Sequence, residues 1–188
     1  MSDFIQAMTD RYVRERGELG LFDVNCWWDP SQEMTFHPVT SLTQLTGELG
    51  RRGITRAVVT SRHSLTGDPA AGNEALARMI QNETGLYGAM VLAPEMAWRG
   101  RDVRAYIDSL LAQRFVCARL FPKKLRHSMS RWLVGDILDH LSERRIPLIL
   151  WHSEVSWEYL EELCRTRPQL PVVVEGNDVK LLYHNRNY

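Results

Sequence analysis

The chain has 188 residues, 44% of them hydrophobic, which is enough for roughly one globular domain to bury most of its apolar surface. Basic and acidic residues number 23 each, so no net field draws nucleic acid or an anionic membrane to the protein. The first 20 residues carry scattered charges and lack an apolar run of signal-peptide length. We therefore expect a cytoplasmic protein without a nucleic-acid or membrane partner.

Apolar segments alternate with helix-like segments along the chain. We expect Ser41 to be the N-cap of the helix that follows the first strand, and Gly53 to end that helix. The sequence predicts strands over 20–27, 54–60, 86–94, 115–122, 146–153 and 170–176, and helices over 41–53, 70–85, 100–114, 130–145 and 156–168. A further helix could begin after Asp178.

The strand segments "PLILW" and "PVVV" are apolar on both faces, which is typical of parallel strands covered by helices. Successive βα units without a topological break favour an α/β fold of the TIM-barrel type, with about six of its eight units, over a doubly wound sheet. No glycine-rich phosphate loop follows the first strand. We expect an N-terminal helical extension over 1–19 and an incomplete barrel domain over 20–188.

Cysteine usage points away from disulfide and thiolate chemistry. Cys26, Cys117 and Cys164 are an odd number, lie far apart and show no CxxC spacing. We expect reduced thiols in or near the core.

Several phrases resemble one known family in their order and spacing: "FDVN", "LGRRGITRAVVT", "GNEALARMI" followed by "LYGAMVLAPE", "ARLFP", "IPLILWHSE" and "RPQLPVVVEG". Together they resemble the metal-dependent amidohydrolase superfamily, in its amidohydrolase-related (family 2) branch of TIM-barrel hydrolases and decarboxylases. The resemblance covers residues 20 to about 185. It implies eight strands in about 250 residues, so this chain is short by two strands.

The resemblance implies a divalent metal such as zinc, held by an HxH pair on strand one and by histidines and an aspartate at later strand ends. Asp23, Asn25 and Trp27 occupy the inward register of strand one, and both histidines are missing. An amide oxygen is a poor zinc ligand, and an indole nitrogen is only a donor. We therefore predict Asn25 and Trp27 as substrate-binding residues and expect Cys26 to point toward the helices.

His152 matches the family's strand-five ligand and is our candidate metal ligand and catalytic residue; the alternative is a pocket histidine held by hydrogen bonds. Glu175 stands near the family's strand-six histidine and is the second catalytic candidate, as a base or ligand. Its alternative role is to close a polar cluster with Asn177. The ligand set as a whole does not support a conventional metal centre.

Arg119 in "ARLFP" either points into the barrel or lies among the helices. Its planar guanidinium suits a carboxylate or phosphate of a ligand, and the alternative is an internal ion pair with Asp23 or Glu175. His63, on the loop after the second strand, is a further substrate-binding candidate, although a solvated loop histidine explains it too.

Two functions follow. The first is an amidohydrolase-like hydrolase or decarboxylase acting on a small carbonyl or carboxylate compound. The second is a metal-free barrel that serves as a binding module for a small molecule or a protein. The free edges of the first and sixth strands predict a homo-oligomer, or a covering segment such as the first 20 residues, unless the sequence is a fragment of a longer barrel.

Overall fold

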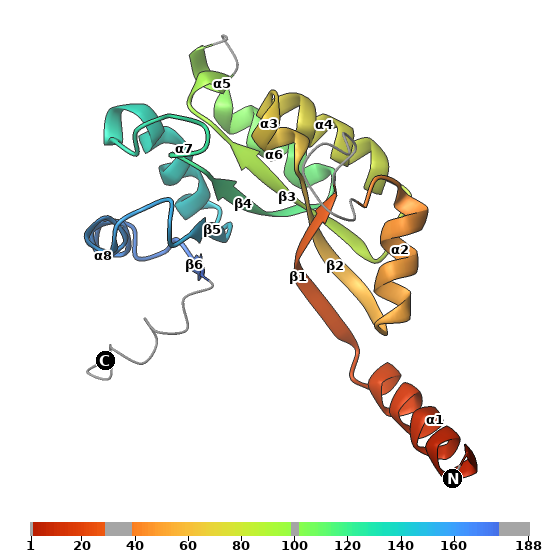
Figure 1. Cartoon of the computed structure of the whole chain (residues 1–188). Coiled ribbons are helices and arrows are strands. Elements are labelled where there is room, and N and C mark those ends of the chain that lie inside the picture. Colours follow the sequence, from red (N-terminus) through yellow and green to blue (C-terminus); the bar gives the residue numbers. More distant parts are fainter. Residues whose placement is uncertain (1, 29–38, 99–101, 177–188) are drawn as a thin grey trace. The chain divides into compact units, whose positions relative to one another are not determined.

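Six strands alternate with helices along the residues that the computed structural model describes, which are 2–28, 39–98 and 102–176 (Figure 1). The helix expected after Asp178 lies outside these residues. The elements are α1 Ser2–Glu18, β1 Leu21–Trp28, α2 Leu42–Arg51, β2 Ile54–Ser61, α3 His63–Thr66, α4 Pro69–Ile80, β3 Leu86–Leu92, α5 Glu95–Trp98, α6 Val103–Ala112, β4 Phe115–Leu120, α7 Arg131–Glu143, β5 Leu148–Trp151, α8 Trp157–Thr166 and β6 Val172–Glu175.

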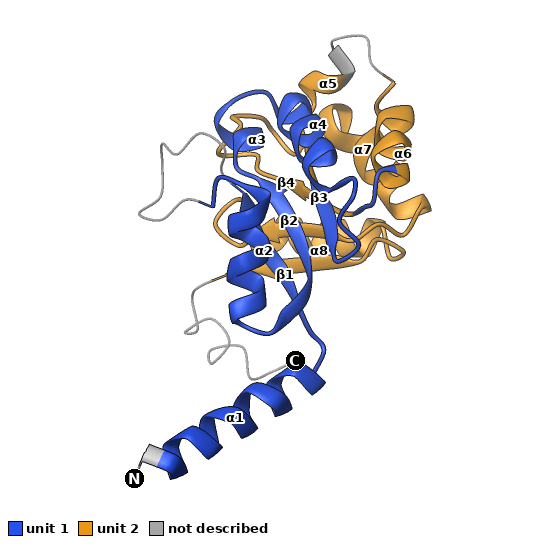
Figure 2. Cartoon of the chain, turned by 90° about the vertical axis from the view of Figure 1, so that its right-hand side faces the viewer, with its two compact units in different colours: residues 1–89, 113–115 blue, residues 90–112, 116–188 orange. Residues whose placement is uncertain are grey.

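The chain forms two units (Figure 2). Unit 1 comprises residues 1–89 and 113–115, and unit 2 comprises residues 90–112 and 116–188. In unit 1, β1 pairs in parallel with β2 and β2 with β3. In unit 2, β4 pairs in parallel with β5 and β5 with β6. Strand order follows chain order without the reversal of a doubly wound sheet, as the predicted barrel-like α/β fold requires.

Local capping chemistry sets the starts of three helices. The Ser41 hydroxyl accepts a hydrogen bond from the Gln44 amide at 3.2 Å, which confirms it as the N-cap of α2. Asp68 caps α4 in the same way, with Pro69 at the first helical position. Ser156 caps α8. Helix α4 begins at Pro69, one residue before its predicted range, and ends at Ile80 instead of 85.

The core of unit 1 forms where α4 packs against β2. Leu76 and Ile80 of α4 are fully buried, as are Val59 of β2 and Ala89 of β3. Gly88 lies close to Phe115, which also belongs to unit 1: a Cβ added to Gly88 would be 2.5 Å from the Phe115 ring. The glycine is therefore required by a close approach of strand and ring.

In unit 2, α6 packs against α7, and strands β4 and β5 supply fully buried positions, among them Ala118, Leu120 and Leu150. β6 is less covered: 47% of Val173 and 38% of Val174 are exposed. Within the part of the chain that the structure describes, no helix is long and apolar enough to cross a bilayer.

Candidate functional site

A buried ion pair lies at the carboxyl ends of β4 and β6 in unit 2. The Arg119 guanidinium donates from Nη1 to Glu175 Oε2 at 3.0 Å and from Nη2 to Glu175 Oε1 at 2.9 Å. Arg119 is fully buried, whereas 17% of the Glu175 side chain is exposed. The internal ion pair that we weighed as the alternative role for Arg119 is therefore present, with Glu175 as the partner.

Trp151, the last residue of β5, adds a third donor to this carboxylate. Its indole Nε1–H donates to Glu175 Oε2 at 2.8 Å. Both carboxylate oxygens are therefore engaged, one of them twice. Glu175 therefore neutralises the buried Arg119 cation. To act as a base or a metal ligand, its carboxylate would first have to release one of these hydrogen bonds.

His152 follows β5 directly and is joined to β6 through the backbone. Its amide donates to the Glu175 carbonyl at 2.8 Å. Its half-buried ring lies against Gly176: a Cβ added to that glycine would be 2.7 Å from Nδ1 of the ring. The backbone of His152 is therefore held next to Glu175 and its ring next to Gly176. That the ring shares a site with the Arg119 and Glu175 pair stays a prediction. Asn177, the other member of the polar cluster we considered, lies outside the described residues.

A second carboxylate fixes the loop that follows β4. Glu154 is 6% exposed and accepts the backbone N–H groups of Lys123 at 2.8 Å and of Lys124 at 3.2 Å. The Lys123 ammonium donates to the Ser153 carbonyl. Sequence reasoning missed Glu154, since an acidic residue just beyond a strand end looks like any solvated loop residue.

Aromatic rings complete this end of unit 2. The exposed Lys124 ammonium lies 5.2 Å from the centroid of the Trp151 ring, and Phe121 meets the same ring edge to face at 5.0 Å. Three cationic side chains, Arg119, Lys123 and Lys124, stand against two carboxylates here. With the histidine neutral, the cluster carries one excess positive charge and suits an anionic ligand.

The predicted site residues of β1 contact one another in unit 1. Trp27 donates its indole N–H to Asn25 Oδ1 at 3.0 Å, and the Arg62 guanidinium lies 5.7 Å from the Trp27 ring centroid. The two side chains share one face of the strand, as period-two alternation predicts.

Alternation fails at Asp23, because β1 carries a register shift between Asp23 and Cys26. The Asp23 carboxylate accepts the Asn25 backbone N–H at 2.8 Å and the Cys26 thiol at 3.1 Å. Our expectation that Asp23 shares the inward register of Asn25 was therefore wrong. Cys26 is buried, in agreement with a thiol on the covered side of the strand.

His63 begins the short helix α3 in unit 1. Its carbonyl accepts the Gly67 amide at 2.9 Å, and its ring folds over the same glycine, 2.9 Å from where a Cβ would be. Unit 1 therefore holds Asn25, Trp27 and His63, and unit 2 holds the other predicted site residues. That the two groups form one site stays a prediction.

The described residues do not fit the divalent metal that the family resemblance implies. Asn25 Oδ1 already accepts the indole N–H of Trp27, and an indole offers no lone pair to a cation. In unit 2 the Glu175 carboxylate is occupied by Arg119 and Trp151, which leaves His152 as the nitrogen donor. Among the described residues, no three His, Cys, Asp or Glu side chains gather as a metal would require.

The buried thiols are poor nucleophiles. Burial raises the pKa of Cys117 to about 11, although the nearby Arg119 lowers it in part. Burial, together with the hydrogen bond to Asp23, raises the pKa of Cys26 to about 12. Both stay protonated at neutral pH. Cys164 is exposed on α8, so the expectation of a core position holds for two of the three cysteines.

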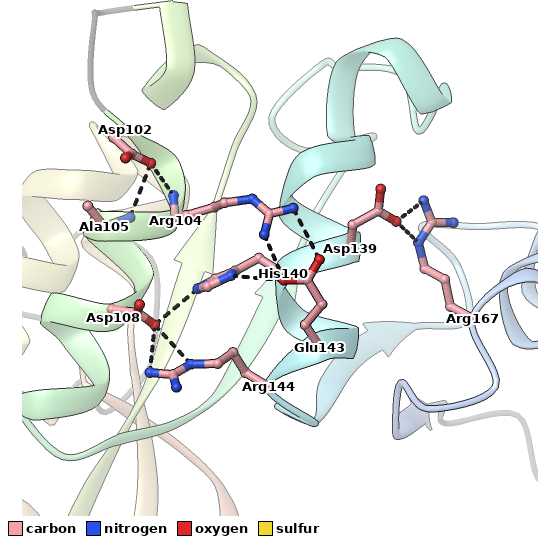
Figure 3. Close-up of polar contacts among 9 residues, drawn as sticks. All are labelled: Asp102, Arg104, Ala105, Asp108, Asp139, His140, Glu143, Arg144 and Arg167. Carbon is pink, nitrogen blue, oxygen red and sulfur yellow. Dashed lines mark hydrogen bonds and ion pairs between the residues drawn. The ribbon is translucent and has the colours of Figure 1, made fainter.

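A polar network that the sequence did not indicate joins α6 to α7 (Figure 3). The buried His140 contacts Asp108 Oδ1 through Nε2 at 3.0 Å, and Arg144 donates to the same oxygen at 3.1 Å. Arg104 pairs with both oxygens of Glu143. The hydrogen bond from His140 lowers the pKa of Asp108. These contacts lie between two helices and are structural.

Comparison with known proteins supports the fold. No protein-family model and no curated protein sequence matches the chain. Among solved structures, the chain is similar to a probable 2-pyrone-4,6-dicarboxylic acid hydrolase from Acinetobacter baumannii with citric acid bound, at a TM-score of 0.58 and 17% identity over 82% of this chain and 57% of that one.

It is also similar to an uncharacterised TIM-barrel protein from Bordetella bronchiseptica, at a TM-score of 0.53 and 16% identity, over 89% of this chain and 59% of that one. The chain thus spans less than two thirds of each of these structures. At such identities the likeness concerns the fold. This chain has a TIM-barrel-like α/β fold, as its strand pattern predicts.

Proposed function

We propose that the chain binds a small carboxylate compound at the carboxyl ends of β4, β5 and β6, and that it does so without a divalent metal. The observation that carries this proposal is the buried Arg119, Glu175 and Trp151 cluster, with an exposed lysine beside it and one excess positive charge. Parallel α/β folds place ligands at this end of the strands.

Each group has a separate part in the proposed binding. The Arg119 and Glu175 pair holds the strand ends together and keeps a guanidinium beneath the site. Lys124 offers an exposed ammonium to a carboxylate, and the Trp151 ring offers an apolar wall. His152 donates a hydrogen bond to the ligand from its imidazole. The citric acid named for the Acinetobacter structure supports the choice of ligand class.

A second candidate is a hydrolase or decarboxylase in which His152 and Glu175 are the catalytic residues and Asn25, Trp27, Arg119 and His63 bind the substrate. The hydrolase name of the Acinetobacter protein supports it. We favour the binding module because the donor set does not suit the metal on which this hydrolysis relies, and because both oxygens of Glu175 are engaged.

Isothermal titration of citrate, with its uncharged trimethyl ester as the control ligand, tests the proposal. We expect weak binding of citrate alone, unchanged by a chelator. Lys124→Gln should weaken it about two- to fivefold, the usual strength of an exposed charge pair, whereas Arg165→Gln on the exposed side of α8 should leave it unchanged. Binding that disappears with the chelator and returns with zinc would establish the metal-dependent alternative.

We also propose that a second copy covers the exposed edges of the sheet. Val173 and Val174 of β6 are 47% and 38% exposed, and Phe22 and Val24 of β1 are 45% and 53% exposed. Apolar edge strands pair readily with other chains. Light scattering after gel filtration should give the mass of a dimer, and Val173→Lys should shift it toward a monomer. A wild-type monomer at all concentrations would refute this assembly.

A further inference from the structure

Gly176, the residue after β6, touches the imidazole of His152. A Cβ added to Gly176 would lie 2.7 Å from Nδ1, 3.2 Å from Cγ and 3.5 Å from Cε1 of that ring. Its φ lies outside the left-handed region that favours glycine, so the backbone alone would accept any residue. The ring contact is therefore what a side chain at this position would disturb.

We infer that Gly176 is a positioning residue, which sets the orientation of the His152 imidazole at the proposed carboxylate site. The inference rests on the proposed function in one respect, namely that His152 contacts the ligand. The His152 backbone is tied to β6 by its 2.8 Å hydrogen bond to the Glu175 carbonyl. Gly176 then determines how closely the ring can approach β6.

The contact distinguishes the two ring nitrogens. Nδ1 is the ring atom nearest to Gly176, and Nε2 is not among the three nearest. Nε2 is thus the nitrogen left to meet the ligand, and as an N–H donor it binds a carboxylate oxygen.

An added methyl group at Gly176 should move the ring without breaking the fold. The atoms that it would meet belong to a side chain with two rotatable bonds, so the imidazole can turn away at low cost. Had the methyl group met only backbone atoms, these could not rotate away, and the fold itself would be strained. Substituting Gly176 by alanine should therefore change the orientation of the His152 ring while leaving the stability of the protein unchanged.

Gly176→Ala is the test, with Gly135→Ala of α7 as its matched control, because a Cβ there would meet only Arg131 Cγ at 3.4 Å. We expect the His152 ring resonances, assigned with His152→Gln, to shift in Gly176→Ala alone. The Kd for citrate should rise about tenfold, the loss of one charge-assisted hydrogen bond, with an unchanged thermal midpoint.

Ring resonances in Gly176→Ala that match the wild type would overturn the inference. Should this variant fail to fold, the wild type still decides: a nuclear Overhauser effect between the Gly176 α-protons and the His152 ring is expected, and its absence would refute the contact. If wild-type protein binds no citrate, the proposed function fails, while the ring resonances and this effect still test the positioning.

Discussion

Replacing Glu175 by glutamine would leave the Arg119 guanidinium buried without its counter-charge. The charge centres lie roughly 4 Å apart, at which distance an effective dielectric constant of about 20 gives about 4 kcal/mol of attraction. Breaking a buried pair on one side costs about 3–5 kcal/mol. Because 17% of the Glu175 side chain is exposed, water screens part of this loss, and we expect Glu175→Gln to cost about 3 kcal/mol.

Urea unfolding followed by tryptophan fluorescence measures this cost as a change in midpoint at constant slope. Trp151, which donates to the same carboxylate, should report the transition directly. The double variant Arg119→Met with Glu175→Gln removes the buried cation as well and should recover most of the lost stability. A cost below about 1 kcal/mol for Glu175→Gln would show that the pair is solvated and would refute the buried cluster.

Three further predictions follow from packing and charge. Gly88→Ala should cost about 1–3 kcal/mol in the same unfolding assay, because its methyl group would overlap the phenyl ring packed there, 2.5 Å away; wild-type stability would contradict this contact. A thiol reagent at neutral pH should label Cys164 alone, since burial raises the pKa of Cys26 to about 12 and of Cys117 to about 11; fast labelling of more than one thiol would show that the buried sites open. The pKa of Asp108 is lowered by its histidine partner, so its stabilising contribution is present above about pH 4 and is lost as pH falls through the folded pKa. Asp108→Asn should therefore destabilise the protein at pH 6, and the difference in unfolding free energy from the wild type should vanish once the pH falls below the lowered pKa of Asp108. A difference that is independent of pH would refute the linkage.

Strand and helix positions were predictable because each depends on local signals. The apolar runs of β2 to β6, the capping serine at Ser41 and the stop at Gly53 were all visible in the sequence. The bulge in β1 was not, since nothing in "FDVNCW" distinguishes a shifted register from plain alternation. For this reason the sequence-based prediction put the Asp23 side chain on the wrong face of β1.

Contacts at the site were predictable only where a buried charged group needs a partner of opposite charge. A buried arginine requires a carboxylate, and Glu175 was one of two that we named for Arg119. Glu154 and Gly176 escaped notice because their importance lies in contacts with residues far away along the chain, the lysine amides and the His152 ring. Such contacts depend on the fold and leave no local pattern.

Carboxylate binding at the ends of β4 to β6 without a metal can be followed by titrating citrate into chelator-treated, isotopically labelled protein, with the indole N–H of Trp151 and the amide of His152 as reporters. We predict saturable shifts of both resonances in metal-free protein. Shifts confined to other residues, or shifts that arise only after zinc is added, would contradict metal-free binding at these strand ends.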